Sequence, residues 1–260
     1  MTGVRKVLWP LVLAGCSGLA GPEKAPTGVL RVFAQAGDDG QYVGRPEATF
    51  LNTPLASFPD SRDPSDLCQL AALLTIPVGR VENLDAGDSI AFTADGGTAY
   101  LYPRADLGGN TVYLPPATFV SLTPGTAVTF QIPGAPGGFP AATFTGLTAP
   151  AITQLSPIPR ASSASDSVVV TWAPTGDDSS RFEVSLQFAT EGATSINRQV
   201  LCQWRDDGRA VIAGNLLSEW ATTAMRRIEV SRFRAAQRDL GSGGVLYFLA
   251  TYDMMPEPAP

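Results

Sequence analysis

After residue 28, most of the chain alternates short apolar and polar positions in runs of four to eight residues, the pattern of half-buried strands. In the first half, such runs cover 29–34, 47–52, 88–94, 98–103, 127–133 and 141–147. Clusters of Gly, Asp and Pro separate the runs at roughly 8–12-residue intervals, a spacing typical of a β-sandwich. Segment 67–76 allows two interpretations, because its Ala and Leu content permits a short helix and its apolar run permits a buried strand.

A Gly- and Pro-rich break around 134–150 precedes a second series of alternating segments. The predicted strands of this series are 167–174, 180–189, 226–235 and 244–253. Residues 199–212 predict a hairpin that turns over Asp206, Asp207 and Gly208. The last strand is apolar on both faces and therefore needs cover on both sides. We expect that cover from within the chain; a partner surface is the alternative.

Trp172 ends one predicted strand, Pro174 follows it closely, and Phe182 begins the next strand. This combination resembles the fibronectin type III family, and it implies an immunoglobulin-like sandwich with Trp172 in its core. Segment 215–220 stands where that family carries its corner tyrosine motif. We therefore predict an all-β protein with an N-terminal β-sandwich domain at 29–149, a fibronectin III-like β-sandwich domain at 150–254, and a disordered tail at 255–260.

Residues 1–15 have the form of an export signal, with a positive start followed by an apolar run of about eight residues. As a helix this run would reach only about 12 Å, well short of the roughly 30 Å hydrocarbon core of a bilayer. The sequence Leu13-Ala14-Gly15-Cys16 resembles the lipobox of bacterial lipoproteins. The resemblance implies cleavage before Cys16 and acylation of this residue, with residues 16–28 forming the lipidated cysteine and a flexible tether. An ordinary leader with an incidental cysteine is the alternative.

The expected location is the bacterial cell envelope. Asp after the modified cysteine commonly marks retention in the inner membrane, so Ser17 favours a lipid anchor in the outer membrane. The formal net charge of −6 and the lack of a basic stripe argue against nucleic acid as a partner.

The chain contains no histidine, which removes Ser-His-Asp and Cys-His catalytic arrangements and His-based zinc sites. We expect no cofactor. Asp60, Asp63 and Asp66 recur at every third position of a polar loop and could hold calcium, although Asp beside Pro and Ser more often forms turns. Turns are the favoured interpretation here.

Trp204 and Trp220 are candidate rings for stacking on a sugar if they are exposed, but Trp204 alternates with Cys202 and Val200, which favours a place in the core. If Cys16 is lipidated, Cys68 and Cys202 remain. An exported chain with this even remainder favours a disulfide between them over two separately buried thiols.

These features predict a membrane-anchored envelope lipoprotein that is not an enzyme and serves as a binding or architectural module. Its expected partners are the membrane, through the anchor, and an envelope protein or glycan. The alternative is a carbohydrate-active or hydrolytic envelope protein that works through Asp and Glu pairs.

Overall fold

The computed structural model describes residues 26–37, 41–53, 59, 65–73, 82–106, 108–159, 166–241 and 244–256. The predicted signal peptide, Cys16, most of the predicted tether and residues 257–260 of the predicted tail lie outside these residues. The described chain is almost entirely β-structure, and the prediction of an all-β fold is confirmed.

Six of the nine described strands of the first half overlap the predicted alternating runs, and two short strands between the runs were not predicted. They are β1 (Thr27–Ala36), β2 (Tyr42–Leu51), β3 (Leu67–Ala72), β4 (Ile90–Ala94), β5 (Gly97–Ala105), β6 (Thr111–Leu114), β7 (Val120–Ser121), β8 (Ala127–Ile132) and β9 (Ala142–Leu147). Segment 67–76, which allowed a helix or a strand, forms strand β3. The turn between β4 and β5 has positive φ at both Asp95 (49°) and Gly96 (75°), which suits a two-residue hairpin.

The second half adds six strands and one helix among the described residues. They are β10 (Val168–Thr171), β11 (Arg181–Phe188), β12 (Arg198–Arg205), β13 (Arg209–Ile212), α1 (Gly214–Thr222), β14 (Arg226–Asp239) and β15 (Val245–Met254). Helix α1 occupies the segment that stands in place of the corner tyrosine motif. Leu217 and Trp220, spaced by three residues, are the large side chains that it buries.

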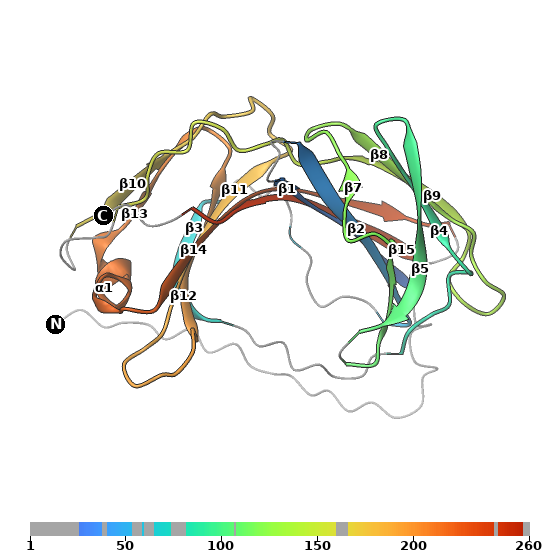
Figure 1. The fold of residues 1–260 in the computed structure, drawn as a ribbon, viewed down its shortest axis with the longest axis horizontal. Helices are drawn as coiled ribbons and strands as arrows, with labels where there is room; N and C mark the ends of the chain where they lie inside the picture. Colours follow the sequence, from blue (N-terminus) through green and yellow to red (C-terminus); the bar gives the residue numbers. More distant parts are fainter. Residues whose placement is uncertain are drawn as a thin grey trace.

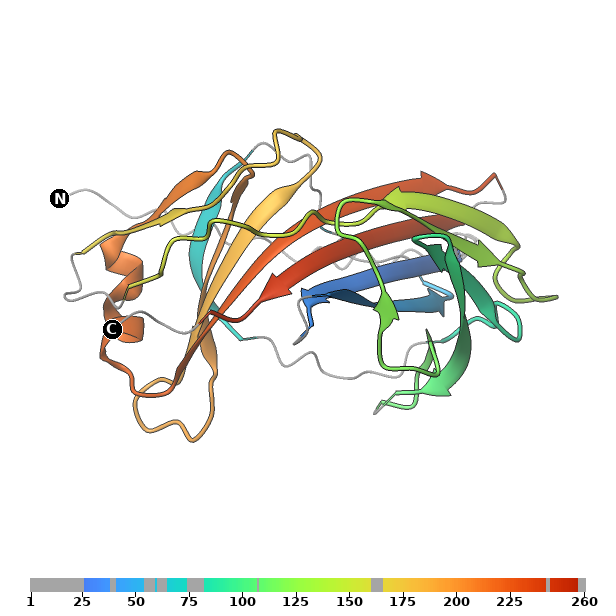
Figure 2. The same ribbon diagram turned by 45° about the horizontal axis from the view of Figure 1, so that its top comes forward.

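Thirteen of the described strands form one hydrogen-bonded sheet, in the order β3-β12-β11-β14-β15-β1-β2-β6-β5-β4-β8-β9, with β7 paired to β2. The long strands β14 and β15 cross the middle of the molecule and connect its two halves (Figures 1 and 2). The predicted domain boundary at residues 149 and 150 stays a prediction, because the backbone hydrogen bonding runs continuously from one half into the other.

The last strand, β15, lies between β14 and β1 and pairs in parallel with β1. Its buried face reaches into the core of the first half, where the Phe248 ring lies 5.1 Å from Phe144 and 6.4 Å from Phe130. The expected cover from within the chain is therefore confirmed for this face, whereas the opposite face, with Tyr247, Leu249 and Thr251, is half-buried. The core of the first half needs a residue that arrives more than 200 positions after its first strand begins.

In the second half, the two-stranded sheet of β10 and β13 lies in a separate layer from the large sheet, to which β11, β12 and β14 belong. Trp172 is 4% exposed and stacks on Phe182, with ring centroids 3.7 Å apart and planes 5° from parallel. Trp172 thus occupies the core position that the fibronectin type III resemblance implies. The predicted hairpin over Asp206, Asp207 and Gly208 is wrong, because the chain changes sheets there: β12 pairs with β11 and β3, whereas β13 pairs with β10.

Strand β3 comes from the first half of the sequence but pairs with β12, at the edge of the second half. The register places Cys68 directly opposite Cys202, and a disulfide joins them across 134 positions of sequence. The predicted bridge is present. In the chain-entropy model, a cross-link over a loop of this length stabilises the fold by up to about 5 kcal/mol.

A buried ion pair between Arg232 of β14 and Asp206 joins the two layers of the second half. The Arg232 Nε lies 2.9 Å from Asp206 Oδ2, and both side chains are 1% exposed. Asp206 also accepts hydrogen bonds from Trp172 Nε1 at 2.7 Å, Thr175 Oγ1 at 2.8 Å and Ser180 Oγ at 2.9 Å. These contacts surround the carboxylate with donors, which is the condition under which a buried charge is tolerated.

Arg232 also donates to the carbonyl oxygens of Ala151 at 2.6 Å and Ala173 at 2.7 Å. Further along β14, Arg234 donates to the Thr148 carbonyl at 2.8 Å and pairs with Asp177, and Arg238 donates to the Thr143 carbonyl of β9. Strand β14 therefore fastens several loops and an edge strand to the large sheet through charge-assisted hydrogen bonds.

We expect Asp206→Ala to lower the free energy of unfolding by about 3–5 kcal/mol, because it leaves the buried Arg232 charge and the Trp172 N–H without their acceptor. Glu47→Ala is the matched control. It removes a carboxylate that pairs with Arg31 at 3.2 Å where the arginine side chain is 47% exposed, so it should cost less than about 1 kcal/mol. Urea unfolding of the two variants measures the difference. Equal losses of unfolding free energy in the two variants would show that the buried Asp206–Arg232 pair contributes no more to stability than the exposed pair does.

Candidate functional site

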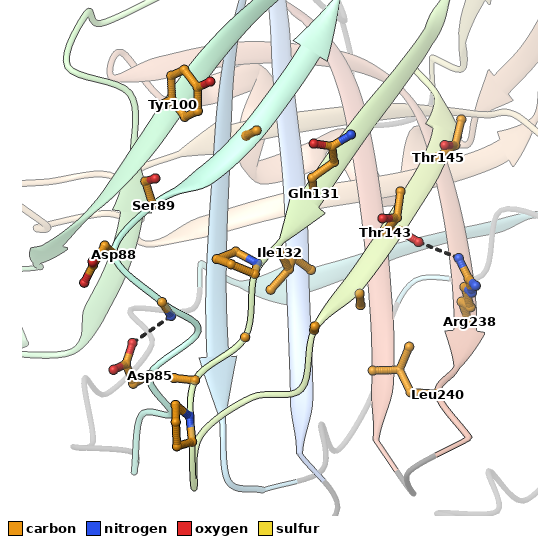
Figure 3. Close-up of a pocket in the computed structure, with 18 residues that line it drawn as sticks. Asp85, Asp88, Ser89, Tyr100, Gln131, Ile132, Thr143, Thr145, Arg238 and Leu240 are labelled. Carbon is orange, nitrogen blue, oxygen red and sulfur yellow. Dashed lines mark hydrogen bonds between the residues drawn. The ribbon is translucent and has the colours of Figure 1, made fainter.

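A groove of about 1320 Å³ lies over the outer face of β4, β8 and β9 (Figure 3). Its floor is a row of directly opposed residues from four neighbouring strands: Tyr100 of β5, Ala91 of β4, Gln131 of β8 and Thr143 of β9. The alternate residues on these strands, among them Phe92 and Phe130, face the core. The groove floor is therefore the solvent side of a well-packed sheet.

Two loops form one wall of the groove. Residues 85–89 precede β4, and residues 133–136 follow β8. Gly134 has a φ of +77°, and a Cβ atom at this position would overlap the backbone of Ala141. The second loop can therefore approach β9 this closely because position 134 is glycine.

The first of these loops is held from below by Tyr113, which is 1% exposed. The Tyr113 hydroxyl oxygen accepts a hydrogen bond from the Ala86 amide at 3.0 Å. Its own proton can be donated to the Gly87 carbonyl at 3.0 Å or to Asp85 Oδ1 at 3.2 Å. Burial raises the pKa of Tyr113, and nearby Asp85 raises it further. The phenol therefore keeps its proton and continues to position the loop across the ordinary pH range.

Charged side chains lie at the ends of the groove and not on its floor. Among the described lining residues, Asp85 and Asp88 are the anions and Arg238 is the cation. In Figure 3 the two aspartates lie at one side and Arg238 at the other, with Gln131 and Thr143 between them. The floor is thus neutral and polar, with one exposed aromatic ring, Tyr100.

Neither of the two tryptophans considered as stacking rings is accessible. Trp204 is 6% exposed and lies 6.3 Å from Trp172, and Trp220 is 0% exposed. The Arg226 guanidinium lies 5.2 Å from the centre of the Trp220 ring. Trp204 thus has the core placement that the alternation favoured, and Trp220 is buried as well. A sugar could stack on either ring only if that ring left the core.

The aspartate triplet considered for calcium is described at one position. Asp60 and Asp63 lie outside the described residues. Asp66 accepts the Arg205 amide proton at 3.0 Å and lies 3.9 Å from its guanidinium. Among the described residues, no three His, Cys, Asp or Glu side chains are arranged to hold a metal ion.

The residues of the groove floor were not among those singled out from the sequence. A signal was nevertheless present, because Tyr100 and Tyr102 alternate with apolar Leu101 and so point to the outer face of their strand. What the sequence did not contain was the register that brings Gln131 and Thr143 into line with Tyr100.

Two carboxylates with altered acidity lie elsewhere, on one face of the large sheet. Glu183 of β11 is opposite Ser231 of β14, and Ser231 is opposite Asp253 of β15. Burial raises the pKa of both carboxyl groups, while hydrogen bonds from Gln203 at 2.6 Å to Glu183 and from Ser231 at 2.7 Å to Asp253 oppose the rise. Paired carboxyls with raised pKa are a possible acid–base set, but neither lines the groove.

The comparisons with known proteins give limited guidance. No protein-family model and no curated protein sequence matches the chain. A DUF4785 family protein from Legionella pneumophila is similar in structure, with 12% identity and a TM-score of 0.26 over 77% of this chain and 49% of that one. The present chain thus spans about half the length of the Legionella protein.

The FN1–FN3 domains of chicken CNTN1 are also similar, with 13% identity and a TM-score of 0.24 over 89% of this chain and 68% of theirs. Both similarities are weak, and nothing about the function of this chain follows from them. Within the described residues, no helix is both long and apolar enough to cross a membrane.

Glu183→Gln should change how stability depends on pH. The pKa of Glu183 is raised in the folded state. Its contribution to the free energy of unfolding is therefore most favourable below the unfolded-state pKa, and this contribution is lost as the pH rises through the folded-state pKa. We expect the variant to melt a few degrees above the parent protein at pH 7 and to match it below about pH 4, where the carboxyl is protonated in the unfolded chain too.

Thermal unfolding across this pH range measures the effect. The exposed Glu191, changed to Gln, is the matched control and should leave the profile unchanged. A Glu183→Gln variant that loses stability at neutral pH would contradict the prediction.

Proposed function

We propose that the protein is a lipid-anchored, non-catalytic binding module of the bacterial envelope, and that the groove over β4, β8 and β9 is its binding surface. Cys16 would carry the anchor, and Ser17 favours the outer membrane as its location. The ligand would be polar and extended, because the groove is open along a sheet face and is not an enclosed pocket.

The observation that carries this proposal is the row Tyr100–Ala91–Gln131–Thr143 on the groove floor. An exposed aromatic ring, a small residue, an amide and a hydroxyl follow one another across adjacent strands, which lie about 4.8 Å apart. A row of this kind offers one apolar surface and several hydrogen-bonding groups to a single ligand, which is the usual composition of a binding site.

The scaffold supports the same function. Pairing of β14 and β15 with their neighbours makes the sheet continuous, and the disulfide Cys68–Cys202 is typical of a protein that folds in an oxidising compartment. A preorganised surface binds with a smaller loss of conformational entropy.

A hydrolytic function has less support. Glycoside hydrolysis in most families needs two carboxyl groups that flank the scissile bond from opposite sides. In the groove, Asp85 and Asp88 come from one loop on one side, and the opposite side carries Arg238. We therefore favour binding over catalysis.

The anchor can be tested by fractionation. We expect Cys16→Ala to abolish labelling by radioactive palmitate and to move the protein out of the membrane fraction, because the acyl chains provide the attachment. Ser17→Asp is the matched variant: it should keep the label and move the protein from the outer to the inner membrane. A parent protein that takes up no label would refute the anchor.

The binding surface can be tested separately by blocking the groove floor. We expect Ala91→Arg to reduce the envelope material retained by the immobilised full chain about tenfold, since it places a long charged side chain in the centre of the row. Ala105→Arg, on an exposed position of β5 outside the groove, is the control and should retain as much as the parent protein. Equal retention by both variants would place the binding surface elsewhere.

A further inference from the structure

We infer that the groove binds an uncharged polysaccharide, with one sugar ring stacked on Tyr100 and the chain crossing β5, β4, β8 and β9. This inference depends on the proposed function and adds the chemical class of the ligand. It follows from the charge, the hydrogen-bonding chemistry and the shape of the groove floor.

The groove floor carries no charge, and the neighbouring row of residues on the same sheet face carries none either. Next to the row of Tyr100, the register places Thr93 opposite Thr98 and Thr129, and Thr129 opposite Thr145. All four side chains of this second row are threonine; Thr145 lines the groove, and the other three extend the same face beyond it. A charged ligand on either row would lose its water without gaining a counter-charge, which is costly, whereas an uncharged ligand avoids this loss.

The groups on these rows match sugar hydroxyls in kind. A hydroxyl both donates and accepts, and so does the Gln131 amide, which means that each can serve a sugar hydroxyl in either role. The Thr93 and Thr98 hydroxyls lie 3.1 Å apart, as do those of Thr129 and Thr145. Each pair uses one proton between its two members, so further donors and acceptors remain for a ligand.

Tyr100 provides the apolar contact that such a ligand needs. Its ring is 51% exposed on a rigid strand at one end of the row. The C–H face of a sugar ring can cover this surface while the sugar hydroxyls reach the polar groups beside it. Hydrogen bonds between a sugar and the protein replace bonds that both make to water, so their net gain is small. Removal of apolar surface from water adds a favourable contribution to the affinity.

Two other ligand classes fit the groove less well. A peptide added as a strand needs a free sheet edge, and at β9 the Thr143 carbonyl already accepts a hydrogen bond from Arg238. An anionic polymer would meet a single cation, Arg238, and two anions, Asp85 and Asp88, along the described lining.

The test measures binding of the purified full chain to two sets of soluble glycans by calorimetry. The uncharged set contains dextran, laminarin and chitin oligosaccharides, and the anionic set contains alginate and heparin. We expect binding to a member of the uncharged set that changes little between low and high salt, because no ion pair is involved. Absence of binding to every uncharged glycan, or binding to the anionic set alone, would overturn the inference.

Variants then assign the binding to the groove. Tyr100→Ala should weaken binding roughly tenfold through the loss of the stacking surface. Thr143→Val, which keeps the branched shape and removes the hydroxyl, should weaken it by a smaller factor. The control is Tyr102→Ala, which removes a tyrosine with 45% exposure from the same strand outside the groove and should bind like the parent. Equal weakening by Tyr100→Ala and Tyr102→Ala would overturn the assignment.

The two binding experiments together separate failure of this inference from failure of the proposed function. If retention of envelope material depends on Ala91 but the chain binds no uncharged glycan, the groove is the binding surface and the ligand is not an uncharged polysaccharide. If retention does not depend on Ala91, the proposed binding surface fails as well.

Discussion

The parallel pairing of β1 with β15 is the constraint on which the rest of the structure depends. It brings the last strand of the chain beside the first, so that two halves that are separate in sequence share one sheet. It also delivers Phe248 to Phe130 and Phe144, beneath the strands that carry the groove. The rigidity of the groove floor therefore depends on a strand that is synthesised last, and the first half completes its core after the whole chain has been made.

Strand β14 explains how the other elements are held to this sheet. Its arginines reach backbone carbonyls of loops and of β9, and a carbonyl bound in this way needs no further strand as a partner. Arg232 differs from the others, because its charge is buried with Asp206 and has to be balanced completely. Arg238 has the opposite setting: it is exposed, it covers part of the β9 edge, and it also forms one end of the groove. Arginines of one strand thus stabilise the core, cover part of a sheet edge and form one end of the groove.

The sequence predicted the class of fold well, because alternation reports directly which residues of a strand face the core. The places of Trp172, Trp204 and Phe182 follow from this local signal. Which strands pair with one another could not be predicted in the same way, since the register between strands depends on residues far apart in the chain. The turn at Asp206 illustrates the difference: Asp-Asp-Gly is a good local turn, but the buried contact with Arg232, twenty-six residues later, decides that the chain changes sheets there. The groove floor was missed for the same reason, because its residues come from four strands and none has a motif of its own.

The proposed anchor at Cys16 would place the groove near a membrane. The described chain begins at Pro26, whose carbonyl accepts the Val245 amide at 2.9 Å, and the strand that ends just before this turn carries Arg238. The segment from Cys16 to Pro26 can span at most about 35 Å even when fully extended. With the anchor proposed at Cys16, the Arg238 end of the groove would lie within a few tens of ångströms of the bilayer surface. A ligand that crosses the strands from Tyr100 toward Arg238 would then be one that lies close to the membrane, and the proposed tether would limit which polymers the groove can reach.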